Sequence, residues 1–486
     1  MRQSYSNQLR LDSVAVEKVC LNLDSRDRLV PVLRALQAVY SDKHLTDQIL
    51  ELVATDINAN TRTDTGRVGM GYWHICVLAA VRLGCDLTYD QLADFAENHR
   101  KLRAIMGLGD CDETEFKYRT IRNNICQLKP ETVSRISLLV VGLGHALEPA
   151  AIEKVRADSF VMETCIHYPT ESSLLLDGIG RSISLSVELA TTHGVSGWRQ
   201  HIHLLKKAKR LNRNINRIAS KKGPNYLKRM KPFYRELLQK SAIVTQRARE
   251  LCGLIGAPTP AATDMFGPHT LQAFVVRTER VADTARRRII DGEVVPNSDK
   301  LFSIFEPHTQ LYKRGKAGQP IQFGRQVLVF EDAVGFLVRG VLMGRDQNDQ
   351  DVAVAQTKLL QEDFNNLVKR LSFDRGFHSP ANQTELGKSV VTVCLPKPGV
   401  KQSVLQMAEA DDGFLAALQN HPGVESAIGA LQRGNALKRC RDRSEVGCER
   451  YIQLAILGRN LQTLGRMLIA REKANAAAGY SQRQAD

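Results

Sequence analysis

The sequence lacks paired cysteines and long apolar runs. Its ten cysteines include no CxxC pair and form no dense framework, so neither a zinc ribbon nor a disulfide-stapled secreted domain is expected. The longest apolar run, near Ile136 to Leu147, is interrupted by glycines and is too short to span a bilayer. The first residues show no signal-peptide pattern. These absences predict a cytoplasmic protein with reduced thiols and no membrane partner.

Acidic residues are nearly missing from one stretch. Between Arg199 and Glu250 there are sixteen Lys and Arg residues against two Glu, in a chain whose net charge is +15. Such a surplus favours a polyanionic partner, and nucleic acid fits better than a membrane. The candidate phosphate contacts in this stretch are Lys206, Lys207, Lys209, Arg210, Arg213, Arg217, Lys221, Lys222, Lys228, Arg229 and Lys231.

Aromatic residues are few, but four of them lie within or beside these cations: Trp198, Tyr226, Phe233 and Tyr234. They could stack on exposed bases. Alternatively, they close the small core of a helical hairpin.

A second basic group reads Lys313-Arg314-Gly315-Lys316. It resembles part of a phosphate-binding loop but lacks the GxxxxGK spacing, which argues against nucleotide hydrolysis. We interpret Lys313, Arg314 and Lys316 as a clamp on a DNA backbone; a solvent-exposed turn is the alternative.

Lys154 to Glu163 alternates like a β-strand and carries Asp158 near its middle. Strands disfavour aspartate, and a carboxylate facing a packed sheet must be desolvated, paired or metal-bound. A solvated edge position, or an ion pair with Arg156, is the alternative to a functional role.

Two further carboxylates fit the same site. Asp374 ends a short apolar run in RLSFDRGFHS, and Glu425 lies near the start of a helical segment in HPGVESAIGALQ. Two aspartates at strand ends and a glutamate on a later helix can converge in a ribonuclease H-like sheet. Such a group needs divalent cations, and hard oxygen ligands suit Mg²⁺ or Mn²⁺. Asp158, Asp374 and Glu425 are therefore the candidate catalytic residues and ligands of two metal ions.

Four segments in order resemble bacterial insertion-sequence transposases of the DDE class: RADSFVMETCIHYPTESSLL, SIFEPHTQLYKRGKAGQPIQFG, SFDRGFHS and HPGVESAIGAL. The resemblance extends from about Leu29 to Leu468. It implies a ribonuclease H-like catalytic domain that cleaves DNA and transfers strands with Mg²⁺ or Mn²⁺. The implied partners are the terminal inverted repeats of the element, target DNA and further copies of the chain, in a bacterial cytoplasm.

The sequence also departs from this family. Related elements often have Arg four residues before the catalytic glutamate and Lys or Arg seven residues after it, where this chain has His421 and Gln432. A non-catalytic DNA-binding descendant and a nuclease of the same fold remain as alternatives.

The expected fold class is α/β, a mixed sheet flanked by helices. The strands after Asp158 are expected in LFSIF, QVLVF, FLVRGVLM and VVTVCLP. In the helical N-terminal part, a turn at 84–86 separates two helices, and Thr88 with Gln91 fits a capping box. This pair of helices is either a DNA-binding helix-turn-helix or part of an ordinary bundle. The expected domains are a helical DNA-binding or dimerisation domain (1–150), a catalytic domain (151–171 and 301–446), a basic helical insertion (172–300), a C-terminal helix (447–475) and a flexible tail (476–486).

Overall fold

The computed structural model describes residues 12–59, 69–255, 267–313, 321–345, 347–399, 404, 406–407 and 412–485. The chain forms two compact units. The first unit contains residues 1–163 and 325–486, and the second contains residues 164–324. Each unit is treated separately below.

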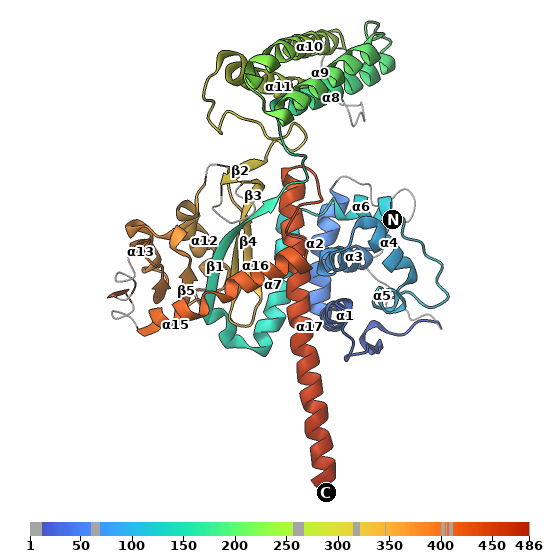
Figure 1. Ribbon diagram of the computed structural model, residues 1–486. Helices are drawn as coiled ribbons and strands as arrows, with labels where there is room; N and C mark the ends of the chain where they lie inside the picture. The colour runs from blue at the N-terminus through green and yellow to red at the C-terminus, as the bar shows by residue number, and fades with distance from the viewer. Residues whose placement is uncertain are drawn as a thin grey trace. The chain divides into compact units, whose positions relative to one another are not determined.

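The first unit combines helices from both ends of the chain with most of a sheet (Figure 1). Its N-terminal helices are α1 (Leu29–Ser41), α2 (Lys43–Asn58), α3 (Tyr72–Gly84), α4 (Tyr89–Asn98), α5 (Arg100–Ile105), α6 (Tyr118–Ile125) and α7 (Pro130–Leu147), with 3-10 turns at Val16–Lys18 and Pro149–Glu153. Its later helices are α12 (Asp349–Asp363), a 3-10 turn at Arg375–Phe377, α13 (Pro380–Leu386), α15 (Asp412–Asn420), α16 (Gly423–Gly434) and α17 (Glu445–Ala485).

The sheet has six strands in the order β2-β3-β1-β5-β6, with β4 also paired to β3. The strands are β1 (Lys154–Glu163), β2 (Gln310–Lys313), β3 (Ile321–Asp332), β4 (Leu337–Leu342), β5 (Arg370–Phe373) and β6 (Thr392–Cys394). β1, β5 and β6 run parallel, whereas β3 is antiparallel to both β2 and β4. The mixed sheet flanked by helices confirms the expected α/β class.

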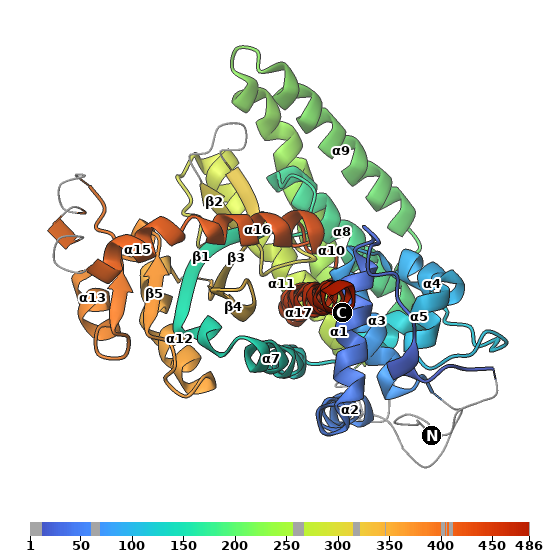
Figure 2. The same cartoon turned by 90° about the horizontal axis from the view of Figure 1, so that it is seen from below.

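Helices cover both faces of this sheet. Figure 2 shows α15 and α16 crossing one face, with α12 and α7 on the other. The strands are apolar enough to require this cover: Val327, Leu328, Val329 and Phe330 of β3 are all fully buried.

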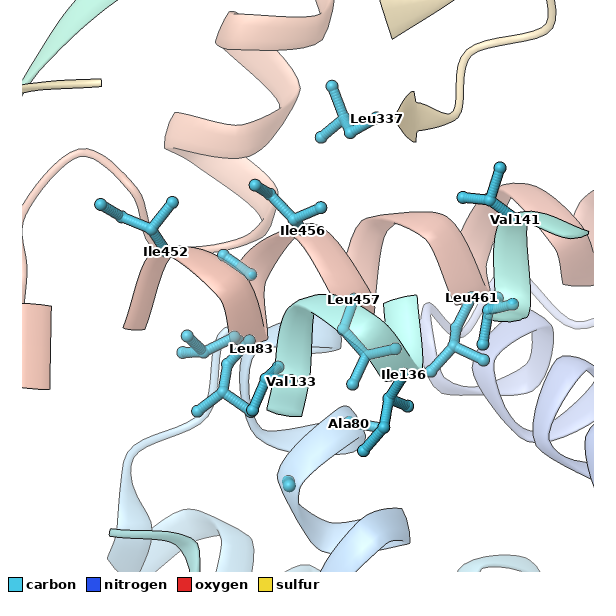
Figure 3. Packing of buried hydrophobic residues seen from close by; sticks show 14 of the residues in the cluster. Ala80, Leu83, Val133, Ile136, Val141, Leu337, Ile452, Ile456, Leu457 and Leu461 are labelled. Carbon is cyan, nitrogen blue, oxygen red and sulfur yellow. The ribbon is translucent and has the colours of Figure 1, made fainter. Parts of the chain in front are cut away.

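Helix α17 forms the centre of the first unit. It packs against α7, α1, α3 and β4, and its apolar residues are buried on several sides (Figure 3). Asn460, fully buried, accepts a hydrogen bond from the Leu337 amide and donates to the Leu337 carbonyl and to Ser137 Oγ. The apolar residues of this helix therefore pack within the chain.

Helix α4 begins where the sequence predicts. The side chain of Thr88 accepts a hydrogen bond from the Gln91 amide, and the Gln91 side chain accepts one from the Thr88 amide, which completes the capping box of α4. Helix α3, by contrast, is buried along nearly its whole length. It is therefore a core element against which the neighbouring helices pack.

The second unit contains a bundle of four helices: α8 (Glu171–Thr192), α9 (His201–Lys221), α10 (Tyr226–Ile255) and α11 (Pro268–Ala285), followed by a π-helical turn at Arg286–Asp291. Its apolar residues form a separate core. Helices α8 and α11 lie so close together that a Cβ added to Gly178 would be 2.4 Å from Thr278 Oγ1.

The structure divides the chain differently from the expected domains. Residues 1–150 do not form a compact unit of their own but share one with the sheet and α17. The second unit begins at Thr164 and ends at Gly324, so it includes β2 and the start of β3 as well as the helical insertion. Helix α17 begins at Glu445 and continues to Ala485, through the segment expected to be a flexible tail.

One expected strand is wrong. LFSIF, residues 301–305, has no strand structure, and Leu301 and Ile304 are buried in the core of the helical bundle. A short apolar run can be buried against a sheet or against helices, and here it is buried against the helices of the bundle.

Candidate functional site

Asp158 and Asp374 belong to neighbouring strands of the first unit. In the parallel pairing of β1 with β5, Arg156 lies opposite Ser372 and Ala157 opposite Phe373. Asp158 and Asp374 are the next residues along the two strands after this last pair. Asp374 directly follows β5 and retains an extended backbone, so its side chain projects from the same face as Ser372.

The N-terminal end of α16 lies over this face. The His421 Nδ1 is 3.1 Å from Ser372 Oγ, and Arg156 Nη1 donates to the Asn420 carbonyl at 3.1 Å. Both strand residues share a face with the two aspartates, because side chains two positions apart point the same way. Glu425 lies in the first turn of α16 and is exposed.

His421 is subject to the charges of this whole group. Burial lowers the pKa of His421, the carboxylates of Asp374 and Glu425 oppose this shift, and Arg156 adds to it. Asp374 and Glu425 are thus both close enough to His421 to influence its ionisation electrostatically.

Arg156, which the sequence offered as a possible partner of Asp158, forms an ion pair with Glu331. Its Nε donates to Glu331 Oε2 on β3 at 2.7 Å. Burial raises the pKa of Glu331 above its ordinary value, and the bond from Arg156 opposes that rise. The backbone amide of Ser159 donates to Asp158 Oδ1 at 2.7 Å.

The turn that carries Asp374 is braced from the opposite face by α12. Gln350 Nε2 donates to the His378 carbonyl, and Asn382 Nδ2 donates to the carbonyls of Gln350 and Phe377. Gln326 Nε2 joins Ser159 Oγ to Asp349 Oδ1, at 2.8 and 2.6 Å. The residues after Asp374 and the residue after Asp158 are therefore both held by hydrogen bonds.

The predicted ligands form an incomplete group. Among the described residues, which include Asp158, Asp374 and Glu425, no three His, Cys, Asp or Glu side chains are placed to hold one metal ion together. The donor chemistry suits a hard divalent cation, since all three candidates offer carboxylate oxygens. Asp158 and Asp374 follow the last paired residues of β1 and β5, and Glu425 is exposed in the first turn of α16.

The basic residues of the second unit form a one-sided surface on α9. The helix His201–Lys221 contains no acidic residue. Its exposed cations recur every three or four residues and so share one side of the helix, which we call the α9 stripe. The stripe consists of Lys206, Lys209, Arg210, Arg213, Arg217 and Lys221. The buried residues Leu204, Ala208, Leu211, Ile215 and Ile218 occupy the other side. The stripe extends over about 22 Å at 1.5 Å per residue.

The other predicted DNA contacts differ in their surroundings. Lys207 pairs with Glu236 at 2.7 Å, and Lys231 Nζ donates to the Ile290 carbonyl at 2.8 Å, so both serve contacts within the bundle. Lys222, Lys228, Arg229 and Lys313 are exposed, whereas Arg314 and Lys316 lie outside the described residues.

The aromatic residues favour the alternative in which they close the core of the bundle. Trp198 and Tyr234 are buried in that core, and Tyr226 and Phe233 pack against it partly buried. Trp198 and Tyr234 are therefore not placed to stack on bases.

Sequence reasoning missed the supporting residues of the site. It noted Arg156 only as a possible partner of Asp158 and His421 only as a departure from the family pattern. Gln326 forms hydrogen bonds to Ser159 on β1 and Asp349 on α12, which are far apart in the sequence. No local sequence pattern indicates these contacts.

Comparison with known proteins adds no relative: no family model, curated protein or solved structure matches this chain. Within the portion of the chain that the structure describes, no helix combines the length and hydrophobicity needed to cross a membrane.

Proposed function

We propose that this chain is a DDE-class transposase with a ribonuclease H-like catalytic domain. It binds the ends of its mobile element as double-stranded DNA, cleaves them by phosphodiester hydrolysis and joins them to target DNA by transesterification. The observation that carries this proposal is the parallel register of β1 and β5. That register pairs Ala157 with Phe373, the residues directly before Asp158 and Asp374, and it supports a site shared by these two aspartates. The turn before the helix that bears Glu425 contacts both strands through Arg156 and Ser372.

Asp158, Asp374 and Glu425 are the residues proposed to hold Mg²⁺ or Mn²⁺, with two ions in the complete site. When bound, such ions supply an activated water and neutralise charge on the attacking and leaving oxygens. The carboxylates orient the cations, and the sheet fixes the two aspartates relative to each other. Glu425 completes the set from the first turn of α16.

The α9 stripe is proposed to bind the DNA backbone. Its cations face away from the apolar core of the bundle. Lysine and arginine side chains in this arrangement neutralise phosphates regardless of base sequence. A synaptic complex of two or more copies of the chain is the expected working form.

The proposal is tested with Asp158→Asn and Asp374→Asn on DNA carrying the ends of the element. Both variants should bind this DNA like the parent and lose at least about a hundredfold in Mg²⁺-dependent cleavage, because each removes a ligand charge without touching the α9 stripe. Glu385→Gln is the control, since this carboxylate on α13 pairs with Lys388 three residues away and is not one of the candidate ligands.

The outcomes separate the alternatives. Cleavage without joining by the parent would identify a nuclease of the same fold. Binding by the parent without any cleavage would identify a non-catalytic DNA-binding protein. Cleavage by Asp158→Asn at the parental rate would show that this carboxylate has been misassigned.

A further inference from the structure

A single arginine connects two strands of the sheet to the turn that precedes α16. Arg156 lies on β1, two residues before Asp158, and is directly opposite Ser372 on β5. Its guanidinium donates to Glu331 on β3 through Nε and to the Asn420 carbonyl before α16 through Nη1. One side chain thus joins two strands of the sheet to the turn that precedes the helix of Glu425.

The guanidinium fits closely against the first residue of α16. A Cβ on Gly423 would lie 2.1 Å from Nη1 and 2.5 Å from Cζ of Arg156. Only a residue without a side chain leaves Arg156 in this position. Gly423 has no positive φ that would otherwise require glycine. The close approach is therefore the structural reason for glycine here.

A second contact fixes the same turn to β5. His421 Nδ1 lies 3.1 Å from Ser372 Oγ, and Ser372 is buried. Arg156 and His421 thus hold consecutive residues of one turn, Asn420 and His421, on two adjacent strands. Because the turn is fixed at two points, the backbone of Glu425 four residues later has little freedom to move relative to Asp158 and Asp374.

We infer that Arg156 is a positioning residue, which holds the start of α16 so that Glu425 can meet the two aspartates. This inference rests on the proposed function. Arg156 acts through its bonds to Glu331 and Asn420, and it is not itself a ligand.

Gly423→Ala tests this inference without changing Arg156. The new methyl group meets the end of a flexible side chain, so Arg156 gives way and the helix remains folded. We expect faster amide hydrogen exchange in residues 421–428 and cleavage slowed by roughly ten- to a hundredfold, since small misplacements of reacting groups are costly. Binding of the same DNA, measured without metal, should match the parent.

Two further variants complete the test. Gly434→Ala is the matched control, because this glycine ends the same helix and nothing lies within 4 Å of an added Cβ. It should resemble the parent in exchange and cleavage. Arg156→Lys keeps the charge but not the forked donor geometry, so it should fall between the parent and Gly423→Ala in both measurements.

The exchange measurement and the cleavage measurement test different parts of the inference. If Gly423→Ala leaves the rate of amide hydrogen exchange in residues 421–428 unchanged, Arg156 does not hold the start of α16. This conclusion does not depend on whether the chain cleaves DNA. Faster exchange with parental cleavage would show that Arg156 stabilises α16 without positioning Glu425. If the parent cleaves no DNA, the proposed function fails, and the positioning role of Arg156 in cleavage fails with it. The exchange measurement still decides whether Arg156 holds the start of α16.

Discussion

Single residues of the site were predicted better than their partners. Asp158 was identified because an aspartate is unusual inside a strand, and the structure does place it in β1. The partner of Arg156 is Glu331, 175 residues away along the chain. Spacing can propose only local pairs, such as Arg156 with Asp158, because distant partners depend on which strands become neighbours.

The third carboxylate gives a prediction at the residue scale. Glu425 lies in the first turn of α16, four residues from His421, which contacts β5. Glu449 lies beyond the first turn of α17, which begins at Glu445. Glu425→Gln should reduce Mg²⁺-dependent DNA cleavage at least about a hundredfold, because a neutral amide is a poor ligand for a hard cation. Glu449→Gln should retain at least roughly a tenth of the parental rate, since it lies on the helix that packs against α7, α1, α3 and β4.

Both variants should show the circular dichroism of the parent. The reverse ranking in the cleavage assay would place the third ligand on α17 and would remove the role assigned here to the start of α16.

Whole elements were predictable where their ends carry a local chemical signal. The capping box at Thr88 and the glycine turn before it located α4 correctly, because these signals act over three or four residues. LFSIF failed because its apolar residues carry no signal of whether a strand or a helix will cover them. Helix α17 was predicted from its apolar residues, but its position between α7, α1, α3 and β4 follows only from the fold.

Close packing of α17 gives a prediction at the element scale. A Cβ on Gly458 would lie 2.5 Å from the Gly84 amide nitrogen and 2.6 Å from the Gly84 Cα, both rigid backbone atoms. Gly458→Ala should therefore force α17 away from α3 and lower the free energy of unfolding by about 1–3 kcal/mol. Chemical denaturation of the full chain measures this difference.

Gly142→Ala is the control for this substitution. Gly142 is exposed within α7 and has nothing within 4 Å of an added Cβ, so alanine should stabilise the helix by about 0.5–1 kcal/mol. Equal stability of the two variants would mean that α3 and α17 do not approach as closely as described.

At the scale of the whole molecule, the sequence located the basic segment but not the unit that contains it. The charge surplus lies in α9 and α10, within the second unit, whereas the candidate carboxylates lie in the first. The boundaries at 163/164 and 324/325 fall inside or directly after strands. The boundary at 324/325 lies within β3, so both of its sides are built from strand residues and no change in composition marks it.

This division predicts that DNA binding and catalysis can be separated. Arg213→Ala combined with Arg217→Ala removes two cations from the α9 stripe, whereas Arg249→Ala combined with Arg288→Ala removes two that pair with Glu279 and Glu171 in the same unit. The two double variants carry the same net charge. The first should weaken DNA binding and reduce the slope of log K against log salt by up to about 0.9 for each lost phosphate contact, and the second should keep the parental slope. The slopes are measured by titrating DNA at several salt concentrations. Equal slopes for both variants would mean that net charge, and not the α9 stripe, determines the affinity.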